Sequence, residues 1–136
     1  MIDFSSQIFT AVASGVRNAH PETKMIGEYV RRPSDFPTVT LDEISNVVVD
    51  RLEDSSQTEK FVGVIYRLQV FSNKQNGKRA EARTIFATAD AEMRKMGFRR
   101  VTYTSTPEIY DSTIYSITAT YEGVISTDGY VYKRNI

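Results

Sequence analysis

The first pattern in the chain is a hydrophobic stripe with a period of nearly four residues, which predicts an amphipathic helix over residues 5–19. The stripe comprises Phe4, Ile8, Val12 and Val16, widened by Phe9 and Ala19. Asp3 or Ser5 can cap the start of this helix, and Pro21 ends it. Gly15 lies in its interior, where it either weakens the helix or allows another element to pack closely.

A second stripe predicts a helix over residues 76–97 that packs on a sheet. Its apolar positions are Ala82, Ile85, Phe86, Ala89, Met93 and Met96. The opposite face is expected to carry Arg83, Asp90 and Arg94, and the last two are spaced for an i,i+4 ion pair. Gly97 then ends the helix as a left-handed C-cap, and the apolar residue after it supplies the contact typical of such a cap.

Alternation of apolar and polar residues predicts strands in the remainder of the chain. The expected strands are residues 24–31, 38–44, 60–72, 98–105, 111–125 and 129–133. Residues 46–52 are either a continuation of the second strand or a separate edge strand. In residues 60–72 one face is uniformly apolar, whereas the other begins with Phe61, Gly63 and Ile65 and continues with polar residues.

Two polar segments, residues 51–60 and 72–78, contain little that a core could bury. We expect them to be protease-sensitive in the free protein and ordered on contact with a partner, unless they are plain hairpin tips. Normal function after deletion of residues 55–57 would remove the role in partner contact.

Composition excludes several function classes. The 136 residues form one domain, and the chain has no cysteine and a single histidine, so neither a thiolate zinc site nor a cysteine nucleophile is available. His20 precedes Pro21, where it can interact with the carbonyls of a helix end. The chain shows no phosphate-binding loop, nucleophile elbow or dinucleotide fingerprint, so we expect neither catalysis nor a cofactor. No apolar run is long enough for a membrane span, and the N-terminus is not a signal peptide, which favours a cytosolic site of synthesis.

Charge is unevenly distributed although it sums to zero. Residues 28–60 hold four basic and eight acidic residues, whereas residues 78–100 hold seven basic and three acidic ones. The two segments are either separate solvated faces or complementary surfaces that meet on neighbouring copies. Such a head-to-tail contact closes a ring when the rotation closes. The candidate subunit or partner interface comprises Arg79, Arg83, Arg94, Arg99, Arg100, Asp50, Glu53 and Asp54.

Five phrases occur in a characteristic order along these elements. Phe36-Pro37-Thr38-Val39 enters a strand, "VFSN" ends the long strand at residues 70–73, and Met96-Gly97-Phe98 closes the helix. "ATYEGVI" at residues 119–125 and "DGYVYKR" at residues 128–134 then follow. Together, over residues 1–134, these phrases resemble the tail terminator, or tail-completion, proteins of long-tailed bacteriophages.

The resemblance implies an α+β fold in which a mostly antiparallel sheet is packed by the N-terminal helix and the central helix. It also implies a structural virion protein, assembled in the host cytoplasm, that forms a hexameric ring at the head–tail interface. Such a ring caps the tail tube, ends its polymerisation and joins it to a head–tail connector or stopper protein. DNA passes through the lumen of the ring without specific binding. The family carries no catalytic motif, and its contact residues vary too much to be transferred.

Two other functions compete with this one. A nucleic-acid-binding module would use Lys78, Arg79, Arg99, Arg100 and the eight tyrosines, which can stack on unpaired bases. The zero net charge argues against it, because phosphate binding usually requires a basic domain. A small enzyme is disfavoured by the lack of nucleophiles and bases. The adjacent carboxylates Asp42 and Glu43 lie on a predicted strand, so they point to opposite faces and cannot act as a pair.

Overall fold

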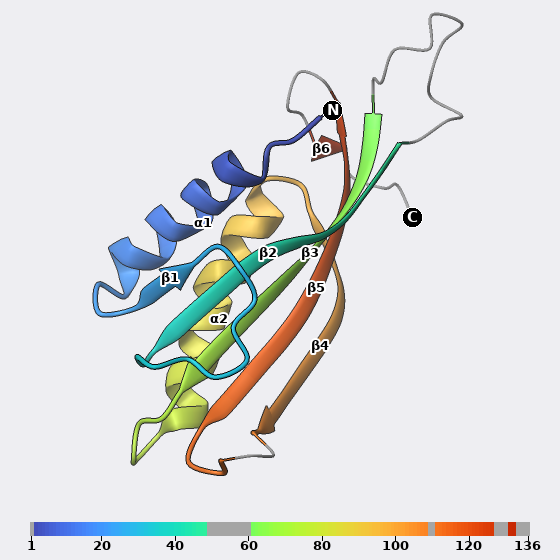
Figure 1. The fold of residues 1–136 in the computed structure, drawn as a ribbon. Helices are drawn as coiled ribbons and strands as arrows, with labels where there is room; N and C mark the ends of the chain where they lie inside the picture. Colours follow the sequence, from blue (N-terminus) through green and yellow to red (C-terminus); the bar gives the residue numbers. More distant parts are fainter. Residues whose placement is uncertain (1, 49–60, 109–110, 127–130, 133–136) are drawn as a thin grey trace, which may run out of the picture.

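The computed structural model describes residues 2–48, 61–108, 111–126 and 131–132. Two helices and six strands form one α+β domain (Figure 1). In chain order they are α1 (Ser5–Ala19), β1 (Lys24–Ile26), β2 (Thr38–Val48), β3 (Phe61–Ser72), α2 (Lys78–Lys95), β4 (Arg99–Pro107), β5 (Tyr115–Ser126) and β6 (Val131–Tyr132).

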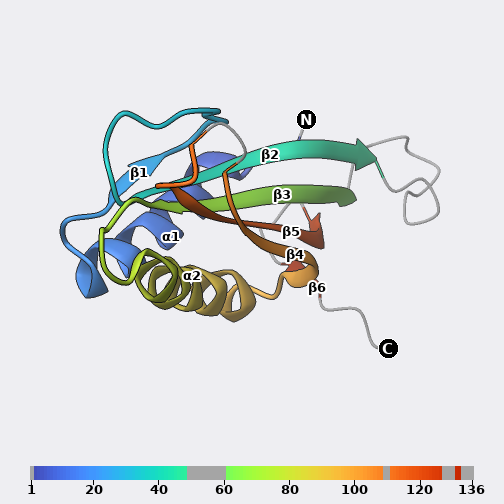
Figure 2. The ribbon, with the colours of Figure 1, turned by 90° about the horizontal axis from the view of Figure 1, so that it is seen from below.

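The strands form one sheet in the order β1-β2-β3-β5-β4, and β6 pairs with the C-terminal end of β5. Only β1 and β2 run parallel, and the other pairs are antiparallel, which confirms the mostly antiparallel sheet. Both helices lie on the same side of the sheet (Figure 2). On the other side, which we call the open face, the connection of residues 27–37 is the one described segment that covers the sheet, at one end (Figure 2).

The helices cover one face of the sheet because the strands present an apolar side to them. On β3 this side consists of Val62, Val64, Tyr66, Leu68 and Val70, all of which are buried. Register places Leu68 beside Leu41 of β2 and Ala119 of β5, so one apolar layer crosses three strands. The predicted stripe of α2 packs on this layer, and Ala82, Ile85, Phe86, Ala89 and Met93 are buried as expected.

The start of α1 differs from the prediction, whereas the end of α2 agrees with it. The prediction of Asp3 or Ser5 as the cap of α1 is wrong, because the N-cap position is Phe4 and no side chain caps it. Asp3 lies one residue earlier, and its Oδ1 accepts hydrogen bonds from the backbone N–H and the hydroxyl of Ser5. These bonds lower the pKa of Asp3. At the end of α2, Gly97 adopts φ 104°, and the N–H of Phe98 donates to the carbonyl of Met93. A glycine with positive φ, followed by an N–H that donates back to the last turn of the helix, is the usual left-handed helix cap.

Gly15 allows close packing of α1 on α2. A Cβ atom at this position would lie 2.5 Å from Cδ of Glu92, so the glycine gives the Glu92 side chain room to cross α1.

Near the end of α1, His20 contacts α2 through its side chain, because its Nε2 lies 3.1 Å from Oγ1 of Thr88. The imidazole therefore joins the two helices, which the sequence did not predict.

Several predicted strands have different bounds in the structure. The strand predicted over residues 111–125 begins only at Tyr115, and the strand predicted over residues 98–105 continues to Pro107. The prediction of a strand over residues 24–31 is wrong beyond Ile26, because the chain turns away there and residues 27–37 cross to the open face (Figure 2). β2 continues past Ser45 as far as Val48, which favours the continuous strand over a separate one. Ile44 forms a bulge that shifts the register between Glu43 and Ser45. The rest of the segment, residues 49–52, lies outside the described residues.

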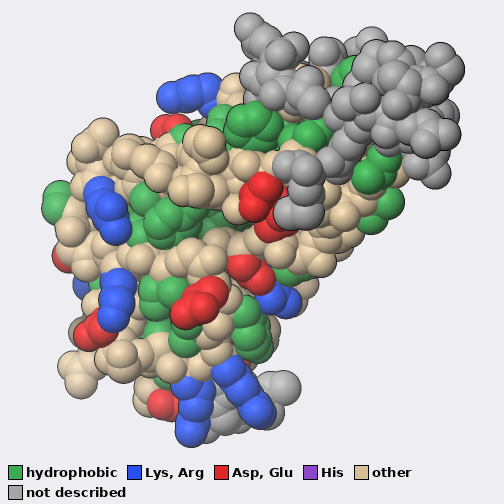
Figure 3. Space-filling view, turned by 45° about the horizontal axis from the view of Figure 1, so that its top comes forward, with side chains coloured by type: hydrophobic (Ala, Val, Ile, Leu, Met, Phe, Trp, Pro, Cys, Tyr) green, Lys and Arg blue, Asp and Glu red, His purple; other side chains and the backbone are tan. Residues whose placement is uncertain are grey.

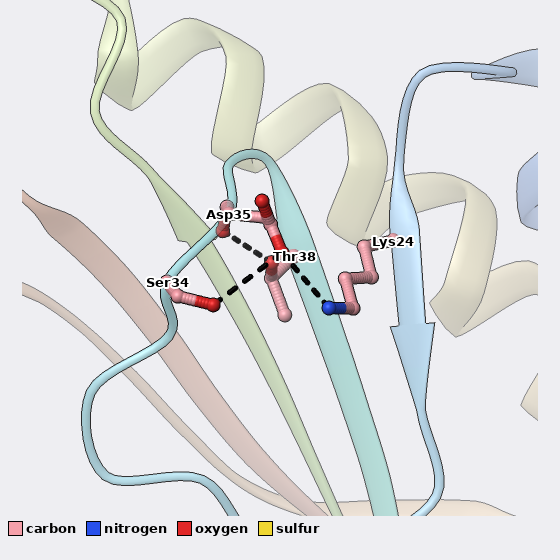
Figure 4. A network of polar contacts seen from close by, with 4 residues as sticks. All are labelled: Lys24, Ser34, Asp35 and Thr38. Atoms are coloured by element: carbon pink, nitrogen blue, oxygen red, sulfur yellow. Dashed lines mark hydrogen bonds and ion pairs between the residues drawn. The ribbon is translucent and has the colours of Figure 1, made fainter.

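The crossing connection is fastened at its end by polar contacts (Figure 4). Asp35 accepts a hydrogen bond from Lys24 Nζ of β1 at 2.8 Å, and that contact lowers the pKa of the Asp35 carboxyl. The Thr38 hydroxyl donates to the Asp35 carbonyl, and the Ser34 hydroxyl donates to the Asp35 carboxylate. These contacts hold the connection against the start of β2.

Candidate assembly surface

The open face has a covered half and an uncovered half. In the covered half Thr38, Thr40, Gln69 and Phe71 are buried beneath the connection of residues 27–37. At the boundary Arg67 of β3 donates two hydrogen bonds to the Asp42 carboxylate, at 2.8 and 3.3 Å. The Tyr29 ring of the connection lies over this guanidinium, with Arg67 Cζ 4.4 Å from the ring centroid. This stack marks where the cover ends.

The uncovered half contains a shallow hollow floored by glycine. Val47 of β2, Gly63 of β3 and Val124 of β5 lie side by side across the strands. Because Gly63 has no side chain, it leaves a gap between the two valines. The resulting hollow has a volume of about 220 Å³, and Ile65 lines its side.

Large apolar side chains around this hollow are exposed. Val47 is 60% exposed, Ile44 is 45% exposed and Ile65 is 37% exposed. Hydrophobic side chains also reach the molecular surface in the space-filling view (Figure 3). Three such side chains on adjacent positions of two paired strands form an apolar patch, and patches of this kind mark protein–protein contacts. We call Ile44, Val47, Ile65 and Val124, together with Gly63, the apolar patch.

An ion pair borders the apolar patch on the side of β4. Arg99 Nη1 lies 3.0 Å from Oε1 of Glu122, its cross-strand partner on β5. Glu122 also pairs directly with Ile65 across the strands, so the charged pair continues the row that contains the patch. An apolar centre with a charged rim is the usual composition of a protein interface.

The structure separates the basic residues that the sequence grouped as one interface. Arg79, Arg83 and Arg94 follow one another along the exposed side of α2, whereas Arg99 lies on the open face. Arg100 lies on the helix side of β4, where its Nη1 is 3.3 Å from Oδ1 of Asp90. Arg99 and Arg100 therefore point to opposite faces of the sheet. The acidic candidates Asp50, Glu53 and Asp54 lie outside the described residues.

Asp90 corrects the prediction for the outer face of α2. It does form the expected ion pair with Arg94, at 3.4 Å, but its side chain is only 15% exposed. The Tyr121 hydroxyl donates to its Oδ1 at 2.6 Å, and this bond together with burial raises the pKa of Tyr121. Asp90 thus lies at the edge between α2 and the sheet, where it accepts from a tyrosine and contacts two arginines.

A second carboxylate lies at the opposite edge of the core. Glu43 of β2 faces the helices, as predicted from the opposite orientation of Asp42. Its Oε1 accepts a hydrogen bond from the Tyr66 hydroxyl at 3.2 Å. Burial raises the pKa of Glu43, although the hydrogen bond from Tyr66 acts in the other direction. Glu43 and Asp42 each have their own partner, so they form no acid–base pair.

A larger hollow lies in the covered half of the open face. A cavity of about 440 Å³ lies between the connection and the sheet, where Tyr29, Gln69 and Thr118 line it. No group of histidine, aspartate and glutamate within the described residues has the arrangement of a metal site. Within the same residues, no helix is both long and apolar enough to cross a membrane.

Sequence reasoning missed the apolar patch as a site, although two signals were present. Gly63 and Gly123 interrupt otherwise apolar strand sequences, and a glycine within a strand often marks a close approach by another chain. The half-apolar second face of β3 was the other signal. Comparison with known proteins adds no name to this surface: no protein-family model matches the chain, and no curated protein is significantly similar to it.

Proposed function

We propose that this chain is a structural assembly protein that forms a ring and caps the tail tube of a long-tailed bacteriophage. The observation that carries an assembly role is the apolar patch on the open face. Ile44, Val47 and Ile65 expose a large part of their side chains, whereas Val62, Val64, Tyr66, Leu68 and Val70 on the other face of β3 are buried. Burial of apolar area contributes about 25 cal/mol per Å², so covering this patch favours association.

The geometry of the patch suits a contact between different surfaces. The Gly63 gap between Val47 and Val124 is concave, and a concave site needs a protruding side chain from elsewhere on the partner. A contact between unlike surfaces is heterologous, and repetition of a heterologous contact closes a ring when the rotation permits. The hexameric number and the position on the tail tube come from the resemblance of residues 1–134 to tail terminators.

The exposed arginines of α2 provide a second contact in this proposal. No ion pair within the described part of the chain involves Arg79 or Arg83. Their positive charge is therefore available for an acidic surface of a neighbouring copy, of the tail tube protein or of the head–tail connector. Arg99 and Arg100 are not part of this second contact, because they lie on β4 and not on α2.

Assembly with the cognate tail tube protein tests the proposal. The unmodified chain should appear in electron micrographs as a ring at one end of each tube, and the tubes should stop growing. Val47→Lys should abolish the ring, because it places a charge in the apolar patch, while the circular dichroism spectrum and the Tm stay unchanged. Ser14→Lys on the exposed side of α1 adds the same charge far from the patch and serves as the matched control.

The nucleic-acid alternative predicts a different outcome. A chain that binds single-stranded DNA through arginine and tyrosine side chains should retard the DNA on a gel, and the retardation should weaken steeply with salt. Tyr66 and Tyr121 are fully buried, so they cannot stack on bases. Retardation of DNA together with failure to cap tubes would favour this alternative over the ring.

A further inference from the structure

The outer edge of β4 is unpaired within the described residues. β4 forms one edge of the sheet, and its only partner is β5. Almost every residue from Arg99 to Pro107 is exposed. A long edge strand presents a row of free N–H and C=O groups, which invites pairing with another strand. The sequence of β4 identifies that other strand.

From these features we infer that two copies of the free chain pair through their β4 strands, antiparallel and centred on Thr104. The pairing is isologous, so one contact covers both edges and leaves none for further growth. It uses the edge of the sheet and not the apolar patch. The inference therefore goes beyond the proposed ring and does not depend on it.

Register is the first argument for a second copy as the partner. In an antiparallel pair centred on Thr104, Thr102 of each copy lies opposite Thr106 of the other. Thr102, Thr104 and Thr106 all lie on the open face, because their β5 partners are Thr120, Thr118 and Ser116. Cross-strand pairs of threonine stabilise an antiparallel sheet. The regular part of β4 is therefore complementary to itself.

The bulge in β4 fits the same register. The strand shifts register between Arg100 and Thr102, so Val101 is the extra residue, and it is 50% exposed. In the pair, the two bulge residues Arg100 and Val101 of one copy together lie opposite Pro107 of the other. Proline has no N–H to donate to a ladder, and a bulge is where such a hydrogen bond is not required. The contact between Val101 and Pro107 is apolar on both sides.

Charge complementarity is the third argument. Beyond the bulge, the register brings Arg99 of one copy opposite Glu108 of the other. Arg99 lies on the open face with Glu122, and Glu108 lines the open-face cavity together with Thr106 and Thr118. The two-fold axis forms this pair twice, and no like charges are opposed. A register centred on Tyr103 instead would leave Glu108 without a basic partner.

Engineered cysteines test the register directly, because the chain has no cysteine of its own. Thr104→Cys places two thiols opposite each other across the axis, and mild oxidation of the purified protein should give a covalent dimer. Thr102→Cys is the matched control. Its two thiols would lie four residues apart along the strands, roughly 13 Å, which is too far for a disulfide. Combining Thr102→Cys with Thr106→Cys should restore the cross-link.

A second measurement uses the charge pair without cross-linking. Analytical ultracentrifugation should find a dimer for the unmodified chain, and Glu108→Arg should raise its dissociation constant at least tenfold, because Arg99 then opposes an arginine. A monomeric unmodified chain at cross-linking concentrations would overturn the inference. So would equal cross-linking of the Thr104→Cys and Thr102→Cys variants, since collision or a different register would then explain the product.

Discussion

Phe86 provides the most direct test of how α2 packs on the sheet. Its side chain is 6% exposed, and its ring meets the Tyr103 ring edge-on, with centroids 5.1 Å apart. Phe86→Ala removes the ring and leaves a cavity between α2 and β4. Truncations of this kind cost roughly 3–5 kcal/mol. We expect about 3 kcal/mol, the lower end of that range, because Tyr103 is part-exposed and can settle into the space.

Equilibrium unfolding in urea measures this loss. With an m-value of about 2 kcal/mol per M, a loss of about 3 kcal/mol lowers the midpoint by about 1.5 M, and the Tm falls by roughly 10 °C. Arg83→Ala on the exposed side of α2 is the control, and its effect should stay within about 0.5 kcal/mol. A loss below about 1 kcal/mol for Phe86→Ala, or an equal loss for Arg83→Ala, would show that α2 presents a different face to the sheet.

Three further changes address the helices and the polar groups. Glu43→Gln should stabilise the protein at neutral pH, because burial raises the pKa of Glu43 and the folded chain binds its proton more tightly than the unfolded chain. This gain in the free energy of unfolding should shrink as the pH falls through the raised pKa, and it should vanish below the ordinary pKa of glutamate. Chemical denaturation at several pH values measures the gain. A gain that does not change with pH would contradict the reasoning. Gly15→Ala should stabilise the Glu92→Ala variant by about 1 kcal/mol, because alanine has the higher helix propensity. In the unmodified chain the gain should be smaller, because the Glu92 side chain must move away from the new methyl group. Equal effects of Gly15→Ala in the two backgrounds, measured by thermal unfolding, would show that the two residues are not coupled. Arg79→Glu combined with Arg83→Glu should leave the Tm within a few degrees but weaken assembly into tails. The assembly that remains should no longer depend on salt concentration. If the strength of assembly and its dependence on salt are both unchanged, these arginines are not part of the interface.

The helices and the central strands were predictable because each carries a long and regular pattern. The boundaries of α1 match the predicted residues, and the buried stripe of α2 was correct at Ile85, Phe86 and Met93. Alternation along β3 identified the face that the helices cover. These predictions succeeded because local periodicity and burial on one side of an element agree.

The features that were not predicted depend on residues far apart in sequence. Asp90 lies four residues after the buried Phe86, at the border of the apolar stripe of α2, and its partner Tyr121 is 31 positions away. The path of residues 27–37 over the open face brings Tyr29 onto Arg67, which lies on a distant strand. The hollow at Gly63 forms only when Val47 and Val124 flank it in the sheet. Sequence periodicity reports one element at a time and cannot detect such contacts.

Charge was the least reliable guide to the surface. The basic segment of residues 78–100 suggested one positive face, yet Arg94 and Arg100 share Asp90, and Arg99 pairs with Glu122. Neighbours in the folded chain therefore neutralise much of the apparent excess. Counting charges along a segment cannot distinguish an exposed patch from a set of ion pairs within the molecule.

Electron microscopy of the chain mixed with its cognate tail tube protein tests the proposed function most directly. The proposal predicts tubes of limited length with a ring at one end, and it predicts that Val47→Lys, but not Ser14→Lys, removes the ring. Tubes that grow without limit and carry no ring in the presence of the unmodified chain would contradict the proposal.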